Sequence, residues 1–260
     1  MAKKPKLRDD RDYDKTQLHE NGSAAAALGR DYAAHFFRWS FAKRFITNKD
    51  TVLEVGCGQD KPLAKMLVSG AAASVLHYTG VDLNKIKLSA SQRTKFHSEF
   101  NFVERYQELL AERPEGWDVV VNMEVIEHMK YEHGCNLLKA MFACTKPGGV
   151  LLLSTPVYDG VRHAANHIHE YFTPELQEAI EAAGYVVERR FGTFMDIKHI
   201  GKAKTGNDEL DKAVKMVRTA LECYYSNDGL SNIFAPLYPD DSRNNLWICR
   251  KPAFIMVAGA

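Results

Sequence analysis

Short apolar runs alternate along most of this chain with stretches in which apolar residues recur every three or four positions. The apolar runs that are typical of strands lie at 51–55, 75–81, 100–104, 117–122 and 149–154. Between them the spacing fits helices, most clearly from Tyr131 to Cys144. Apolar strands separated by helices predict an α/β fold with a parallel sheet that is covered on both faces.

The pattern changes at both ends of this region. Residues 1–20 are dense in charge and poor in apolar residues, which predicts a flexible tail. After the fifth apolar run, Thr173 and Pro174 are typical of a helix start. Gly184 is typical of the end of that helix, and a sixth strand is predicted at 185–191.

Residues 193–245 interrupt the alternation of strands and helices. Asn207 is predicted to cap an amphipathic helix within them, and an aromatic stretch rich in Asn, Asp and Pro follows. A last strand is expected from residue 246. We therefore predict a core made of 21–192 and 246–260, with 193–245 as an insertion or lid packed on it.

A helical stretch precedes the first strand. Residues 24–46 carry aromatic side chains at spacings of three and four. Arg38, within this stretch, has the fork-shaped set of donors that suits a carboxylate or phosphate on a substrate. The alternative is an amphipathic helix that only packs on the sheet.

Composition narrows the class of protein without identifying it. The chain has 260 residues and a net charge of +1, which gives no general attraction to nucleic acid or membrane. The hydrophobic content of 45% and charged content of 26% are ordinary for a soluble protein. Five cysteines without a CxxC pair suggest reduced thiols, and no long apolar run or leader is evident. We expect a cytoplasmic protein with no membrane partner, and the oligomeric state stays open.

The first predicted strand ends in the run Glu54-Val-Gly-Cys-Gly58. Gly56 and Gly58 allow a sharp turn and a close approach of a ligand to the backbone, and such a turn aims helix amides at that ligand. Asp82 follows the second strand, where its carboxylate can accept hydrogen bonds from both ribose hydroxyls. Lys61 stands where a dinucleotide fingerprint needs its third glycine, which disfavours NAD.

The run from Glu54 to Gly58 resembles the first motif of the class I S-adenosylmethionine-dependent methyltransferases. The segment 117–128 is similar to the fourth-strand motif of that family, and 146–154 looks like its fifth strand. The resemblance extends from about residue 30 to about residue 190. It implies a three-layer α/β/α Rossmann-like sheet of seven strands, the last antiparallel, which here carries a helical insertion.

The same resemblance implies S-adenosylmethionine as the cofactor. Glu54 is then expected near the methionine amine, Asp82 at the ribose and Leu83 against the adenine. The end of the fourth strand is expected to line the reactive end of the cofactor. The full set of cofactor residues implied in this way is Glu54, Gly56, Cys57, Gly58, Asp82, Leu83, Asn122 and Met123.

Acids and histidines cluster after the fourth strand. Glu124, Glu127 and His128 share one face if that segment is helical. His163, His167 and His169 follow the fifth strand, whose end neighbours that of the fourth. Three roles stay open: His128 as a base or pocket residue oriented by Glu127, packing alone, or a divalent metal. The metal ligands would be Glu124, Glu127, His128 and His169.

The sequence therefore predicts a methyltransferase acting on the oxygen of a small-molecule acceptor. The pattern Glu-x-x-Glu-His with a downstream histidine also resembles ubiquinone-pathway O-methyltransferases and small-RNA ribose 2′-O-methyltransferases, which are metal-assisted. A nucleic-acid enzyme of the ribose 2′-O type is thus one alternative. A protein that binds the cofactor without transferring a methyl group is another. Asn122-Met-Glu-Val lacks the prolines typical of enzymes that methylate exocyclic amines of DNA.

Overall fold

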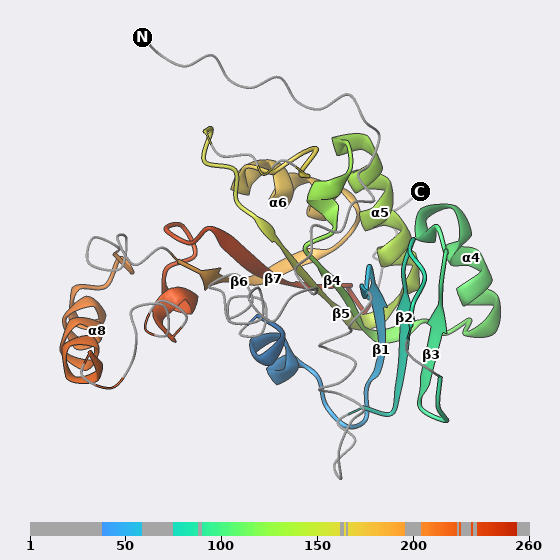
Figure 1. Cartoon of the computed structure of the whole chain (residues 1–260), viewed down its shortest axis with the longest axis horizontal. Coiled ribbons are helices and arrows are strands. Elements are labelled where there is room, and N and C mark those ends of the chain that lie inside the picture. The colour runs from blue at the N-terminus through green and yellow to red at the C-terminus, as the bar shows by residue number, and fades with distance from the viewer. Residues whose placement is uncertain are drawn as a thin grey trace, which may run out of the picture.

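The computed structural model describes residues 38–58, 75–87, 90–161, 164, 166–195, 204–222, 224, 230 and 233–253. Within them, seven strands form one sheet in the order β3-β2-β1-β4-β5-β7-β6 (Figure 1). The strands are β1 (Thr51–Val55), β2 (His77–Val81), β3 (Thr94–His97), β4 (Trp117–Met123), β5 (Thr145–Pro156), β6 (Val186–Phe194) and β7 (Asn244–Arg250).

One strand runs against the others. The pairs β1–β2, β1–β4, β2–β3 and β4–β5 are parallel, whereas β7 lies antiparallel to both β5 and β6. The expectation of a seven-stranded sheet whose last strand is antiparallel is therefore confirmed.

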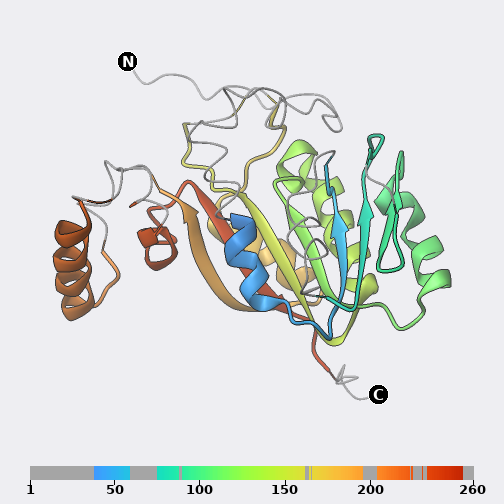
Figure 2. The same ribbon diagram turned by 60° about the horizontal axis from the view of Figure 1, so that its bottom comes forward.

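Helices cover both faces of the sheet. The helices are α4 (Phe102–Glu112), α5 (Tyr131–Cys144), α6 (Thr173–Ala182) and α8 (Asp208–Leu221), with 3₁₀ turns η1 (Lys43–Phe45), η2 (Ile126–His128) and η3 (Ala235–Leu237). Helices α4, α5 and α6 pack on one face. The helical residues 38–42 and η1 pack on the other face (Figure 2).

Successive side chains along the strands point to opposite faces of the sheet and contribute to two separate hydrophobic cores. In β4, Val120 contributes to the core under α4, α5 and α6, whereas Val119 and Val121 contribute to the core under residues 38–46. Leu151 and Leu152 of β5 divide in the same way. Both faces of the central strands are thus buried, which explains why their sequences are apolar without alternation.

The strand predicted at 100–104 is wrong. The third strand is β3, and the segment after it begins helix α4 at Phe102, with Asn101 as the N-cap. Phe102 and Leu109 are the buried side chains of this helix, with Tyr106 packed against the same core. Those positions fall on one helical face, so the apolar run at its start marks a helix N-terminus.

The two predicted helix starts in the second half lie close to the observed ones. Phe172, one residue before the predicted capping hydroxyl, is the N-cap of α6, and its amide donates to Glu175. Gly184 follows that helix with φ of +106°, as a terminating glycine does. Asn207 caps α8 by accepting from the amides of Glu209 and Leu210, each at 3.1 Å, which confirms the predicted cap.

The segment between β6 and β7 begins and ends against the sheet. A Cβ atom on Gly192 of β6 would lie 2.2 Å from the carbonyl oxygen of Ala235, so η3 rests directly on this strand. Val214 of α8 packs in a small cluster with Phe234 and Tyr238. Helix α8 itself stands beyond the β6 edge of the sheet (Figures 1 and 2). In the described part of the chain, no helix combines the length and apolar character that a membrane span requires.

Candidate functional site

The polar side chains singled out in the sequence gather at one edge of the sheet. The carboxyl ends of the parallel strands β1, β2, β4 and β5 meet there. The reversed strand β7 brings its first residues to the same edge, because Asn244 pairs with Pro156 and Asn245 with Thr155. Ligands of open α/β sheets bind at this edge.

The glycine turn after β1 has left-handed backbone at both glycines. Gly56 has φ of +76° and Gly58 has φ of +69°. The amide of Gly56 donates to the carbonyl of Val81 at 2.9 Å, which fastens the turn to β2. A Cβ atom on Gly56 would lie 2.3 Å from Cγ2 of Val125, whereas one on Gly58 would meet no described atom within 4 Å. Among the described residues, the turn is therefore packed against Val125 at Gly56 and has no neighbour at the Cβ position of Gly58.

Asp82 at the end of β2 is linked to that turn. Its carboxylate accepts the amide of Gly58 at 2.7 Å and the amide of Asn84 at 2.8 Å. Its exposed fraction is only 6%, and the adjacent Leu83 is half-buried. Asp82 is thus linked directly to the glycine turn through Gly58.

Glu54 has a partner that the sequence analysis missed. The hydroxyl of Tyr78 on the neighbouring strand donates a hydrogen bond to its carboxylate, and both residues are buried. Burial, followed by the nearby charge of Glu54, raises the pKa of Tyr78 well above its ordinary value, so the phenol keeps its proton. A buried carboxylate held in this way suits a cationic group such as an ammonium.

Asn122 joins the ends of β4 and β1. Its amide nitrogen donates to the carbonyl of Val55 at 2.9 Å. Its buried side-chain oxygen has no hydrogen-bond partner among the described residues, so it can accept from a ligand. Met123 follows Asn122 and is buried in the core under residues 38–46. Cys57 is a buried thiol in the glycine turn.

Glu124 departs from the predicted helical face. Its φ is +54°, so the chain leaves β4 in the left-handed backbone conformation. This conformation is strained for a residue other than glycine and persists only where surrounding contacts hold the residue in place. The carboxylate accepts from Ser154 at 2.9 Å and Asn244 at 2.6 Å, and lies 3.4 Å from the Arg38 guanidinium. Arg38 is 2% exposed. Arg38 is therefore buried and paired with Glu124.

Glu127 lies in η2 and is completely buried. One carboxyl oxygen accepts from the hydroxyl of Thr155 at 2.9 Å, while the other has no hydrogen-bond partner in the described chain. Burial, and then the charge of Glu124, raises the pKa of Glu127 well above its ordinary value. The carbonyl of Glu127 also accepts the amides of Ile168 and His169, at 2.8 and 3.0 Å, which holds the loop after β5 against η2.

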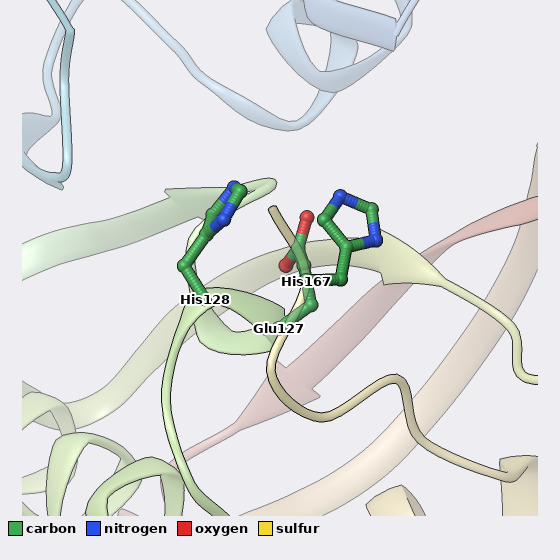
Figure 3. A group of neighbouring side chains, drawn as sticks. All are labelled: Glu127, His128 and His167. Carbon is green, nitrogen blue, oxygen red and sulfur yellow. The ribbon is translucent and has the colours of Figure 1, made fainter. Parts of the chain in front are cut away.

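That backbone contact brings two imidazoles together. Glu127, His128 and His167 each place one potential ligand atom within 4.8 Å of the others, and their side chains extend to the same side of the ribbon (Figure 3). The two rings meet edge-on with centroids 5.1 Å apart. Nδ1 of His128 lies 2.9 Å from the carbonyl of Asn166. Because a carbonyl only accepts, this nitrogen carries a proton.

The predicted metal set does not form as a unit. Glu124 is held by Ser154, Asn244 and Arg38, and His169 lies 3.1 Å from Glu175 with its ring against Tyr171. His163 lies outside the described residues. The group that comes together among the described residues thus keeps Glu127 and His128 of the predicted set and has His167 in place of Glu124 and His169.

An ion pair between Glu170 and Arg243 contacts His167. Nδ1 of His167 lies 2.6 Å from Glu170 Oε1, and Arg243 donates to both oxygens of Glu170 at 2.8 and 3.0 Å. Burial opposes ionisation of Glu170, but hydrogen bonds from His167 and Arg243 outweigh it and lower the pKa to about 2. The sequence analysis assigned no role to Glu170 or Arg243. The local sequence pattern that could have indicated the contact is the spacing of Glu170 three residues after His167.

The chain matches the methyltransferase domain family over residues 27–203. It therefore belongs to this family, and its sheet has the fold of the class I S-adenosylmethionine-dependent methyltransferases.

Among similar proteins is a ubiquinone biosynthesis O-methyltransferase of Pseudomonas fluorescens, 33% identical over 107 residues. The match covers 40% of this chain and 43% of the relative, so the chain spans less than half the length of this curated relative.

Two solved structures share the fold at low identity. A SAM-dependent methyltransferase from Archaeoglobus fulgidus superimposes with a TM-score of 0.56 and 15% identity, covering 86% of this chain and 95% of that one. A 1,6-didemethyltoxoflavin-N1-methyltransferase from Burkholderia thailandensis, with its substrate and S-adenosylhomocysteine bound, gives a TM-score of 0.53 and 17% identity. That match covers 86% of this chain and 82% of that one.

Proposed function

We propose that the protein transfers a methyl group from S-adenosylmethionine to a hydroxyl oxygen of a small-molecule acceptor. The observation that carries this proposal is the pairing of two groups at one sheet edge. The Gly56 turn and Asp82 form a nucleoside site, and His128 and His167 provide imidazoles beside the adjoining strand ends.

The residues of the cofactor site fit S-adenosylmethionine. Asp82 is placed to accept from the ribose, and the open space at Gly58 admits a ligand close to the backbone. Glu54 provides a buried carboxylate for the methionine amine, and the unused oxygen of Asn122 provides an acceptor. S-adenosylmethionine supplies a methyl group on a positively charged sulfur.

The protein's own contribution is alignment and proton removal. Holding the acceptor oxygen in line with the methyl carbon can supply roughly 7–11 kcal/mol. Removal of the hydroxyl proton by a positioned base adds about 10²–10⁴-fold. His128 lies in the proposed acceptor pocket as a base or as part of its wall, and Glu127 behind it is held by Thr155.

The similar proteins favour a small acceptor. The relative from Pseudomonas fluorescens is named as an O-methyltransferase, and the Burkholderia thailandensis structure holds a small heterocycle beside its cofactor product. We propose that the reaction proceeds without a metal, because Glu124 and His169 are engaged elsewhere.

The first experiment is a calorimetric titration of the full chain with S-adenosylmethionine. Saturable binding of one equivalent is expected, and no binding would overturn the proposal. The second experiment uses methyl-labelled cofactor with separate panels of phenols and catechols, amines, and RNA, each with and without EDTA. We expect label on the hydroxyl panel, unchanged by EDTA. Label on RNA alone, on amines alone, or only with added Mn²⁺ would contradict it.

A further inference from the structure

One row of residues crosses the neighbouring strands β1, β2 and β3 (Figure 1). In this row Gly80 of β2 pairs with Glu54 of β1 on one side and with Phe96 of β3 on the other. Tyr78 lies two residues before Gly80 on β2, so its side chain points to the same face of the sheet. The Tyr78 ring extends along the strand as far as this row, because its hydroxyl donates a hydrogen bond to the carboxylate of Glu54.

The missing side chain of Gly80 leaves the space that this ring occupies. A Cβ atom at Gly80 would lie 3.1 Å from Cε1 of Tyr78. It would also lie 3.0 Å from Cδ1 of Phe96 and 3.0 Å from Sγ of Cys57 in the glycine turn. The rings of Tyr78 and Phe96 are tilted, with centroids 5.9 Å apart. The ring of Tyr78 is thus packed tightly at a position where a larger residue than glycine would push it away from Glu54.

We propose that Tyr78 is a positioning residue for the methionine end of the cofactor, and that it holds the carboxylate of Glu54 where this carboxylate receives the ammonium group of S-adenosylmethionine. This assignment rests on the proposed function and goes further, because Tyr78 acts through Glu54 and needs no contact of its own with the cofactor.

The chemistry of the phenol suits this role. Burial, and then the charge of Glu54, raises the pKa of Tyr78 well above its ordinary value, so the hydroxyl stays a donor. A hydrogen bond to a carboxylate in a buried site is strong and fixes its orientation. Because the phenol is neutral, it orients the carboxylate without cancelling its negative charge. A carboxylate has about four acceptor positions, so the bond from Tyr78 is compatible with donors from an ammonium group.

The contact has a consequence for methyl transfer. An ammonium group held at Glu54 fixes one end of the methionine chain, while Asp82 fixes the ribose at the other side of the sulfur. The direction of the bond between sulfur and the methyl carbon is then restricted before the acceptor arrives, which is the alignment that the transfer requires.

The first test compares three nucleoside thioethers by calorimetry. S-adenosylhomocysteine has both the amine and the carboxylate of the methionine end. 5′-Deoxy-5′-(3-aminopropylthio)adenosine keeps the amine alone, and 5′-methylthioadenosine has neither group. Tyr78→Phe is expected to weaken the first two by about 5–50-fold and to leave the third within about twofold. An equal loss for all three ligands, or no loss for any, would overturn the role of Tyr78.

A matched control removes another buried phenol. The hydroxyl of Tyr185 lies 2.7 Å from that of Thr145, and Tyr185 belongs to the core on the other face of the sheet. Tyr185→Phe should leave the affinity for all three ligands within about twofold, and thermal unfolding of both variants measures the cost of each lost hydroxyl. If Tyr185→Phe also weakened only the two amines, the selective loss would not belong to Tyr78.

A double variant tests whether Tyr78 acts through Glu54. Glu54→Gln removes the charge, so it should weaken the two amines and spare 5′-methylthioadenosine. Adding Tyr78→Phe to this variant is expected to change the affinity for the amines by less than about twofold. A further loss as large as that in the single Tyr78→Phe variant would mean that the two residues act independently, which contradicts the proposal.

The last measurement keeps the side chain intact and needs no variant to fold. Tyr78 alone carries ¹³C at Cζ, introduced at a suppressed stop codon, and its signal is followed during titration with the same ligands. We expect a larger shift with the aminopropyl compound than with 5′-methylthioadenosine, and equal shifts would overturn the role. If the unmodified protein bound neither S-adenosylhomocysteine nor S-adenosylmethionine, the proposed function itself would be refuted. If it bound both and the Tyr78 tests failed, this role alone would be.

Discussion

Thr155 donates a hydrogen bond to one carboxyl oxygen of Glu127, and the other oxygen has no partner among the described residues. A fully buried carboxyl with one contact resists ionisation, and its pKa is raised chiefly by burial. The unfolded chain releases this proton above pH of about 4.5, whereas the folded protein keeps it, so folding becomes less favourable as the pH rises between the two pKa values.

Glu127→Gln removes this ionisation and keeps the shape of the side chain. We expect the variant to gain stability over the unmodified protein as the pH rises from 4 to 7, by about 1–3 kcal/mol. Urea unfolding at each pH measures the difference. Glu132→Gln, at an exposed position on α5, is the control and should follow the unmodified protein. A difference that stays flat or shrinks with pH would show that Glu127 is ionised in the folded state.

Gly56→Ala is expected to be more damaging than Gly58→Ala. Both glycines have left-handed backbone, which costs another residue about 1–2 kcal/mol. Only at Gly56 does the added Cβ atom also collide with Val125, which adds about 1–3 kcal/mol of crowding. Thermal unfolding should rank the two variants, and Val125→Ala should partly restore Gly56→Ala. Equal effects of both variants would argue against the packing of Val125 on this turn.

Asp82→Asn is expected to weaken binding of S-adenosylmethionine. The carboxylate organises the turn through Gly58, and charged hydrogen bonds to a ribose are worth about 1.5–3 kcal/mol, or roughly 10–150-fold in affinity. Calorimetry gives the dissociation constant. Asp118→Asn is the control, since Asp118 sits at the opposite end of the sheet and bonds to Thr51. A loss of affinity in both variants would point to general damage to the fold.

Arg243→Met is expected to destabilise the protein at neutral pH by about 3–5 kcal/mol, because it leaves Glu170 buried without its cation. The pKa of Glu170 is about 2, below its ordinary 4.5. Its contribution to stability is therefore complete above pH of about 4.5 and is lost as the pH falls through about 2.

The variant should therefore approach the unmodified protein in stability as the medium is acidified. Urea unfolding at pH 7 and pH 3 measures both values. Lys212→Met, which breaks the exposed pair with Glu209 on α8, should leave stability unchanged at either pH. A variant equally destabilised at both pH values would mean that Arg243 acts through packing alone.

Much of the sheet follows from local sequence. The strands β1 and β4 are mostly apolar runs between polar segments, and helix α5 spans the same residues, Tyr131–Cys144, that the spacing predicts. The segment at 100–104 was misassigned because Phe100, Phe102 and Val103 lie within four residues, as apolar residues do in a strand. The helical spacing of Phe102 and Leu109 becomes visible only over a longer stretch.

The glycine turn after β1 was predictable for the same local reason, since both of its glycines have left-handed backbone. The acid–histidine group was only partly predictable. The positive φ of Glu124 removes it from the face expected to carry Glu127 and His128, and short-range patterns do not indicate such a conformation. Glu170 and Arg243 are 73 residues apart, and no local sequence pattern around either residue indicates that they pair.

The reversed direction of β7 determines which part of the chain reaches the acceptor pocket. A parallel last strand would have presented its final residues there, and the polypeptide would then have continued away from the site. Here β7 instead begins at this edge of the sheet, so Arg243 reaches Glu170 and Asn244 reaches Glu124 there. The reversal of one strand therefore brings the end of the segment after β6 to the edge of the sheet that carries Gly56 and Asp82, and no other strand has to change direction.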